Sequence, residues 1–197
     1  QIAAEQDEQI ANIPNKQTAA EQNEQLNIHG AVRPLIITPG NYGEDFISAH
    51  PLLKNIPVVK CSNFIGASID FAAVYHFTHV LFVGHAGKFV KLAGGIMNTH
   101  SHTADCRLEL VACHAALCGA PQKIVKKIMT CATVDAALDV LNQYDGTANE
   151  IKQENGTQCA QKTGCNSRFV QEVMNSLMSA AEEHVARRVD NAYEFGI

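Results

Sequence analysis

From Val32 onward the chain repeats one pattern three times: a short apolar run, a loop containing glycine or proline, and a helical stretch. The apolar runs are VRPLIITPG, IPVVKCSN and THVLFVGHAG, and the helical stretches are NYGEDFISAHPLLKN, FIGASIDFAAVYHF and KFVKLAGGIMN. Short β-branched runs that alternate with helices are typical of parallel βαβ units. Their strands read as continuous apolar runs because helices cover both faces. The sequence therefore predicts an α/β fold with a small parallel sheet and right-handed crossovers.

The rest of the chain has helical periodicity. Gly119 is a helix stop, Pro121 a helix start and Thr133 an N-cap, so several helices are expected after residue 104. Apolar residues of a last long amphipathic helix recur at Phe169, Val173, Leu177, Ala181 and Val185. Before the sheet, QIAAEQDEQI nearly repeats as QTAAEQNEQL, in residues that favour helix.

These patterns divide the chain into two parts. We predict a polar, Gln-rich helical segment at 1–30 and one α/β domain at 31–197. Within the domain, residues 31–100 form the βαβ core and residues 104–197 form a mainly helical extension.

Three loops should meet at one edge of the sheet. The carboxyl ends of parallel strands lie together, and ligands of open α/β sheets bind in the crevice there. The loops are TPGNYG (38–43), CSNFIG (61–66) and VGHAGK (83–88). Their glycines allow close approach of a ligand to the backbone. The sequence therefore predicts a binding site at this edge, although neither GHAGK nor GNYGED has the spacing of a Walker A or dinucleotide-binding motif.

Basic residues follow the third loop. Lys88 and Lys91 are three residues apart and share a helix face, and Arg107 lies one turn into the next predicted helix. They form a compact cationic group in a chain of net charge −5. Such a group suits the carboxylates of a polyanionic ligand, with solvated surface charge as the alternative.

A metal site is the rival interpretation of the segment NTHSHTAD. His100, His102 and Asp105 form H-x-H-x-x-D, which resembles part of the metal motif of metallo-β-lactamase-type hydrolases. The other histidines lack the spacing that such a motif needs. A structural interpretation places Asp105 in the first turn of the next helix, with His100 or Ser101 as the cap.

Composition excludes several classes of function. The net charge of −5 does not favour nucleic acid, and the sequence has no apolar run of the roughly 20 residues that a membrane helix needs. No CxxC pair occurs among the seven cysteines, so we expect reduced thiols. The N-terminus has no apolar core of a signal peptide, and we expect a cytoplasmic protein.

The motifs TPGNYGEDF, SNFIG, VGHAGKFVKLAGGIMNTHSHTADCRLE and AALCGAP, in this order, resemble the cobalt-precorrin-5B C(1)-methyltransferase family, CbiD. The resemblance covers residues 30–145 well and residues 165–197 loosely. It implies methylation at C-1 of a cobalt-bearing corrin precursor, with S-adenosylmethionine as methyl donor, in the oxygen-independent branch of cobalamin synthesis. The substrate is then a small-molecule corrinoid, and no protein-bound metal is expected.

The resemblance also implies roles for residues. Candidates for the methyl donor's site are Pro39, Gly40, Asn41, Gly43, Ser62, Asn63, Gly84 and Gly87. Candidates for binding the macrocycle and its carboxylates are Lys88, Lys91, Asn98, Thr99, Ser101 and Arg107. Candidate proton acceptors are Asp105, His100 and His85.

This chain departs from the family pattern, in which an N-terminal half with a glycine- and threonine-rich opening motif precedes the TPGNYG region. It resembles the C-terminal part, so one alternative to a methyltransferase is a non-catalytic corrinoid- or nucleotide-binding fragment. The other alternative is the metal-dependent hydrolase that would use His100, His102 and Asp105. The sequence leaves open whether the chain forms a homo-oligomer.

Overall fold

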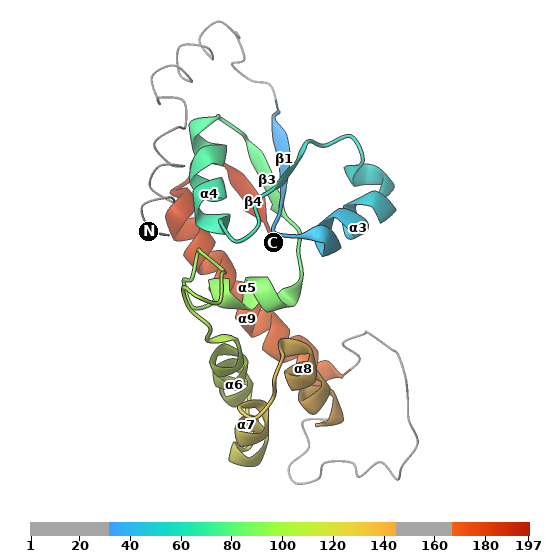
Figure 1. The fold of residues 1–197 in the computed structure, drawn as a ribbon, viewed down its shortest axis with the longest axis vertical. Coiled ribbons are helices and arrows are strands. Elements are labelled where there is room, and N and C mark those ends of the chain that lie inside the picture. The colour runs from blue at the N-terminus through green and yellow to red at the C-terminus, as the bar shows by residue number, and fades with distance from the viewer. Residues whose placement is uncertain (1–31, 145–166) are drawn as a thin grey trace, which may run out of the picture.

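The computed structural model describes residues 32–144 and 167–197 as a four-stranded parallel sheet beside a group of helices (Figure 1). The strands are β1 (Pro34–Thr38), β2 (Val58–Lys60), β3 (His79–Phe82) and β4 (Glu194–Gly196). The helices are α3 (Asn41–Ala49), the 3-10 turn η1 (Pro51–Leu53), α4 (Ile65–Val74), α5 (Ala86–Leu92), α6 (Arg107–Leu117), α7 (Gln122–Ile128), α8 (Val134–Gln143) and α9 (Arg168–Val189). The predicted α/β fold is confirmed. The helical segment expected at 1–30 lies outside the described residues.

The sheet has the order β2-β1-β3-β4, and all neighbouring strands are parallel. Ile36 of β1 pairs with Val58 on one side and with Leu81 on the other. The first three strands lie in the predicted apolar runs. The fourth was not predicted, because Glu194–Gly196 contains a single apolar residue and so forms no apolar run. It forms where the chain returns after α9 to the edge of β3, and His79 pairs there with Glu194.

The direction in which successive strands are added to the sheet reverses at β1. The connection through α3 leads from β1 to β2, and α4 then carries the chain back past β1 to β3. Figure 1 shows α3 and α4 on opposite sides of the strands. The connections that leave β1 and β3 therefore diverge, and such a point opens a crevice at the strand ends.

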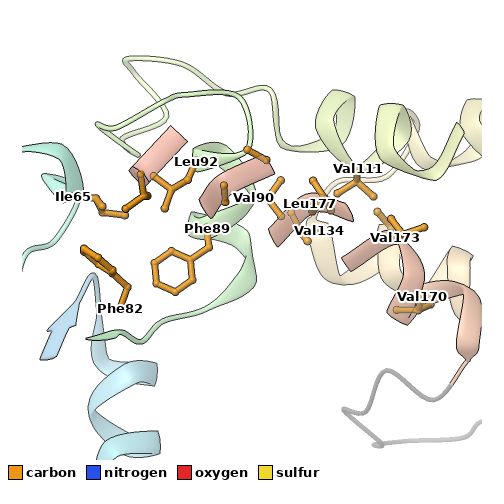
Figure 2. Packing of buried hydrophobic residues seen from close by; sticks show 14 of the residues in the cluster. Ile65, Phe82, Phe89, Val90, Leu92, Val111, Val134, Val170, Val173 and Leu177 are labelled. Carbon is orange, nitrogen blue, oxygen red and sulfur yellow. The ribbon is translucent and has the colours of Figure 1, made fainter. Parts of the chain in front are cut away.

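One apolar core joins the sheet to the helices. Figure 2 shows Phe82 and Ile65 at one end of it, Phe89 and Leu92 of α5 in the middle, and Val111, Val134, Val173 and Leu177 at the other end. The long helix α9 packs against α4, α5, α6 and α8. It is the amphipathic helix that the sequence predicted, and its buried side carries all five of the predicted apolar residues. The mainly helical extension and the βαβ core thus share one interior.

Local signals explain where several helices begin and end. The hydroxyl of Thr133 accepts a hydrogen bond from the Ala136 amide at the start of α8, as predicted. Gly119 has φ +95° just beyond α6, which fits its predicted role as a stop. The first predicted helix is shorter than expected. It ends at Ala49 because Pro51 cannot continue it, and a separate 3-10 turn follows.

The edge of the sheet differs from the expectation. The strand β2 lies at the sheet edge with all three residues exposed, although a strand covered on both faces was predicted. The five cysteines in the described part of the chain form no disulfide with one another. Of the described helices, none combines the length and the apolarity that crossing a membrane requires.

Candidate functional site

A pocket of about 380 Å³ lies at the carboxyl edge of the sheet, where the connections from β1 and β3 diverge. It is lined by Pro39, Gly40, Tyr42, Gly43, Asn63, His85, Gly87, Lys88, Lys91, Thr99, His100, Ser101 and Arg107. All three predicted loops contribute to it. A fourth segment, which connects α5 to α6, forms another part of the wall. The expectation that the loops share one rim is confirmed.

The pocket brings together most of the predicted residues. Of the residues expected at the methyl donor, Pro39, Gly40, Gly43, Asn63 and Gly87 line it, whereas Asn41, Ser62 and Gly84 do not. Of those expected at the substrate, Lys88, Lys91, Thr99, Ser101 and Arg107 line it, and Asn98 does not. Of the expected proton acceptors, His85 and His100 line it, and Asp105 does not. Tyr42 was missed, although its place in the first loop was a usable signal.

Lys88 fastens the three loops to one another. Its Nζ donates to the carbonyl oxygens of Pro39 at 2.9 Å and Ser62 at 3.1 Å, and to Asn63 Oδ1 at 2.9 Å. Ser62 has φ +53°, a left-handed conformation that is uncommon outside glycine. Partial burial lowers the pKa of the Lys88 ammonium. All three N–H bonds of this ammonium are therefore committed to the protein itself.

Lys91 lies one turn further along α5 and is only 2% exposed. Its Nζ donates to the carbonyl oxygens of Thr99 at 3.0 Å and Ala104 at 2.8 Å, and it lies 3.9 Å from Asp105 Oδ1. The sequence suggested a side chain that reaches out to a ligand carboxylate. The geometry corrects this, because the buried ammonium holds the connection between α5 and α6 in place.

Asn63 joins the second loop to the same connection. Its backbone oxygen accepts from the Thr99 amide at 2.9 Å, and its Oδ1 accepts from the Thr99 hydroxyl at 3.3 Å. Because Asn63 Oδ1 also accepts from Lys88, one side-chain oxygen links two walls of the pocket. The pocket is consequently built on a connected set of hydrogen bonds rather than on independent loops.

Arg107 and Asp105 form a forked ion pair. The distances are 2.7 Å from Nε to Oδ1 and 2.8 Å from Nη2 to Oδ2. The hydrogen bonds from Arg107 lower the pKa of the Asp105 carboxyl. Asp105 does not lie in the first turn of α6, as the sequence had suggested. That helix begins at Arg107 behind Cys106, and neither His100 nor Ser101 caps it.

The two histidines of the pocket use the same ring nitrogen in the same way. His85 caps α5, and its Nδ1 accepts from the Gly87 amide at 3.1 Å. His100 Nδ1 accepts from the His102 amide, also at 3.1 Å. On the other side of its ring, His85 Nε2 lies 3.6 Å from Asp135 Oδ1 of α8. Each Nδ1 lone pair therefore points at a backbone donor.

Comparison with known proteins assigns the family. The model of the CbiD C-terminal domain matches residues 98–197, just over half of the chain. The chain belongs to the CbiD family. The match begins beside Thr99, so it includes the connection between α5 and α6 that lines the pocket, together with the helices behind it.

Curated relatives of this CbiD-family chain are named cobalt-precorrin-5B C(1)-methyltransferase. One from Ruminiclostridium cellulolyticum is 48% identical over 116 residues, which are 59% of this chain and 30% of the relative. Another from Thermoanaerobacter sp. is 40% identical over 121 residues, which are 61% of this chain and 33% of the relative. The chain thus spans about a third of the length of these relatives. No solved structure gives a significant match.

The rival metal site is not supported by the geometry of this CbiD-family chain. The rings of His100 and His102 are 6.1 Å apart, and the carboxylate of Asp105 is engaged by Arg107. Within residues 32–144 and 167–197, no group of three or more His, Cys, Asp or Glu side chains is placed to hold a metal ion. A hydrolase that uses these three residues would have to rearrange the Asp105–Arg107 pair first.

Proposed function

We propose that this chain is part of a methyltransferase that transfers a methyl group from S-adenosylmethionine to C-1 of cobalt-precorrin-5B, in cytoplasmic cobalamin synthesis. Membership of the CbiD family and the names of the relatives support this proposal. One structural observation carries it: the three sheet loops and the connection ahead of α6 converge on a single pocket. Ligand sites of open α/β sheets lie at this position.

The size of the pocket limits what this chain can bind by itself. About 380 Å³ is near the lower end of the range for small-molecule sites, roughly 300–1,000 Å³. Such a volume suits one small ligand or one edge of a macrocycle, and it does not hold a methyl donor and a corrinoid together. Because the matched segment is only about a third of each relative, we propose that their remaining residues complete the site.

The residues present fit a ligand of this class. A Cβ added to Gly40 would meet no atom within 4 Å, so the first loop leaves open space beside the pocket. When bound, S-adenosylmethionine supplies a methyl group on a sulfonium, which is already activated for transfer. The work left to the protein is mainly alignment of donor and acceptor. Loops fastened by Lys88 and Asn63 are suited to that work.

Calorimetric titration of the 197-residue chain tests this proposal. The ligands are S-adenosylhomocysteine and cobyrinic acid, a cobalt corrinoid with free carboxylates. We expect at least one to bind with Kd below about 1 mM, or −4.1 kcal/mol. Gly40→Leu should weaken that binding because the added side chain enters the pocket. The matched control is Ala116→Leu on the exposed side of α6. If neither ligand binds, this chain does not carry the proposed site.

Because the chain matches only about a third of the length of its relatives, a second candidate function is binding of the corrinoid or nucleotide without catalysis. A methyl-transfer assay on this chain separates the two. Product formation by the chain alone supports the enzyme, whereas tight binding without product supports the binding part.

A further inference from the structure

The lining of the pocket is cationic although the protein is acidic. Its ionisable residues, other than histidine and tyrosine, are Lys88, Lys91 and Arg107, and no carboxylate is found among the lining side chains of the described residues. The whole chain carries a net charge of −5. A concave site lined by one sign of charge concentrates ligands of the opposite sign.

The two lysines supply charge without a free donor. Lys88 has three protein acceptors for its three N–H bonds, and Lys91 has two carbonyl acceptors and a nearby carboxylate. An ammonium offers three donors in total. A ligand anion would therefore feel the positive potential of both lysines but take its hydrogen bonds from other groups.

Arg107 is the cation that retains free hydrogen-bond donors. It uses Nε and Nη2 on Asp105, and its Nη1 makes no hydrogen bond to any described residue. A guanidinium has five N–H donors in a rigid fork. Arg107 lines the pocket and Asp105 does not, so the carboxylate fixes the guanidinium from outside the lining.

Both histidines are hydrogen-bond donors at Nε2 when neutral. A neutral imidazole carries one proton, and a nitrogen that accepts from a backbone N–H is the unprotonated one. In His85 and His100 that nitrogen is Nδ1, so the proton is on Nε2. His85 directs Nε2 toward Asp135, whereas Nε2 of His100 has no hydrogen-bond partner among the described residues. Neither ring offers a free lone pair for taking a proton from a ligand.

We propose that this pocket is a carboxylate-binding site, in which Arg107 and the Nε2–H of His100 grip the anion and Asp105 positions Arg107. The inference rests on the proposed function and deepens it. It also reassigns Asp105, His100 and His85, which the sequence suggested as proton acceptors. The buried ammonium groups of Lys88 and Lys91 fix the loops and contribute their charge.

Two ligands of the proposed reaction could supply the carboxylate. One is an acetate or propionate side chain of the corrinoid, and the other is the amino-acid end of S-adenosylmethionine. Two matched pairs of probes distinguish them in calorimetry on the full 197-residue chain. Cobyrinic acid is compared with its heptamethyl ester, and S-adenosylhomocysteine is compared with methylthioadenosine, which lacks the amino-acid group. Citrate serves as a small tricarboxylate that is independent of the proposed reaction.

In at least one pair we expect the probe with free carboxylate to bind about tenfold or more tightly than its partner, which is about 1.4 kcal/mol. Equal affinities within both pairs would overturn the carboxylate site and leave the proposed function standing. Binding of citrate that depends on Arg107, without binding of corrinoid or nucleoside, would support the site and reject the proposed function. A folded chain that binds none of the five probes contradicts both.

Paired variants test the individual residues. Arg107→Gln and His100→Asn should each weaken binding of the carboxylate probe, the first by about tenfold. Asparagine can keep an acceptor near the place of Nδ1 while removing the Nε2–H. Their controls are Arg187→Gln, which breaks a single exposed ion pair with Glu183 on α9, and His102→Asn, at a ring that does not line the pocket. Variants and controls with the same affinity would contradict the assignment.

Asp105→Ala separates positioning from simple electrostatics. Removal of a negative charge near an anion site should tighten binding, whereas loss of the group that fixes Arg107 should weaken it. We expect weaker binding, and tighter binding would reject the positioning role. The tautomer has its own test in ¹⁵N-resolved NMR spectra of the histidine rings. Neutral His100 should carry its proton on Nε2, and a proton on Nδ1 would overturn the proposal.

Discussion

The ammonium nitrogen of Lys88 and the side-chain oxygen of Asn63 lie 2.9 Å apart, which joins the first turns of α5 to the loop that follows β2. The same ammonium also binds the loop that follows β1, through the carbonyl oxygen of Pro39. The three loops of the pocket therefore depend on one side chain for their relative positions.

Lys88→Met should lower the free energy of unfolding by about 1–3 kcal/mol, because three acceptors lose a charged donor. Urea unfolding followed by circular dichroism measures the change. The matched control is Lys60→Met, since Lys60 makes one exposed ion pair with Glu44 at 2.7 Å. Such a pair contributes about 0–1 kcal/mol. Equal losses in the two variants would show that Lys88 is not a fastening residue.

Gly43→Ala should be much more harmful than Gly40→Ala, although the two glycines lie in the same loop. A Cβ at Gly43 would collide with Thr38 Oγ1 and the Val83 carbonyl oxygen, whereas a Cβ at Gly40 would meet no atom within 4 Å. We expect a loss of about 1–3 kcal/mol at Gly43, from overpacking, and less than about 1 kcal/mol at Gly40. At about 2–4 °C per kcal/mol, thermal unfolding resolves this difference. Similar melting temperatures would contradict the close packing of α3 on the strand ends.

Arg188→Lys should weaken the contact between α9 and α4. Arg188 makes a forked pair with Asp70, at 2.9 Å and 2.7 Å, and donates to the Gly66 carbonyl oxygen at 3.1 Å. Lysine cannot reproduce that fork. We expect a loss of about 1 kcal/mol in urea unfolding, against less than about 0.5 kcal/mol for Arg187→Lys, whose pair with Glu183 lies within one helix. The reverse order of these losses would reject the bridge.

His114 should make stability depend on pH. It is buried on α6, its Nδ1 lies 2.8 Å from Ser176 Oγ on α9, and burial lowers its pKa below the ordinary 6.5. The unfolded chain then takes up a proton more readily than the folded one, so stability falls as pH drops below about 6.5. Between pH 7.5 and 5.5, the melting temperature of the His114→Gln variant should fall less than that of the parent chain. Parallel pH profiles would contradict this.

Much of the fold could be predicted because its signals are local. Apolar runs and glycine loops located β1, β2 and β3, and the shared polarity of parallel strands placed their loops at one edge before any contact was known. The cap at Thr133 and the stop at Gly119 follow from single residues. β4 has no such signal, since it contains a single apolar residue, Phe195, and its place beside β3 is set by tertiary packing.

The sequence predicted most of the residues that line the candidate site, but not what each side chain does there. Sequence spacing placed Lys88, Lys91 and Arg107 near the loops, and all three line the pocket. It could not reveal that carbonyl oxygens from distant turns would take up the lysine donors, because tertiary packing alone positions those carbonyls. The sequence also did not reveal that Asp105 lies ahead of α6 and pairs with Arg107. A residue just before a helix and a residue inside its first turn have the same sequence signals.

The pairing of His79 with Glu194 places β4, the last of the described strands in sequence, beside a strand that emerges from the ribosome far earlier. During synthesis, the outer edge of β3 stays without its neighbour until residues 194–196 have left the exit tunnel. Open strand edges are templates for unwanted pairing with other chains. Nascent chains on crowded polysomes would therefore be more prone to aggregation before residues 194–196 emerge, and chaperones that shield extended segments would act in that interval.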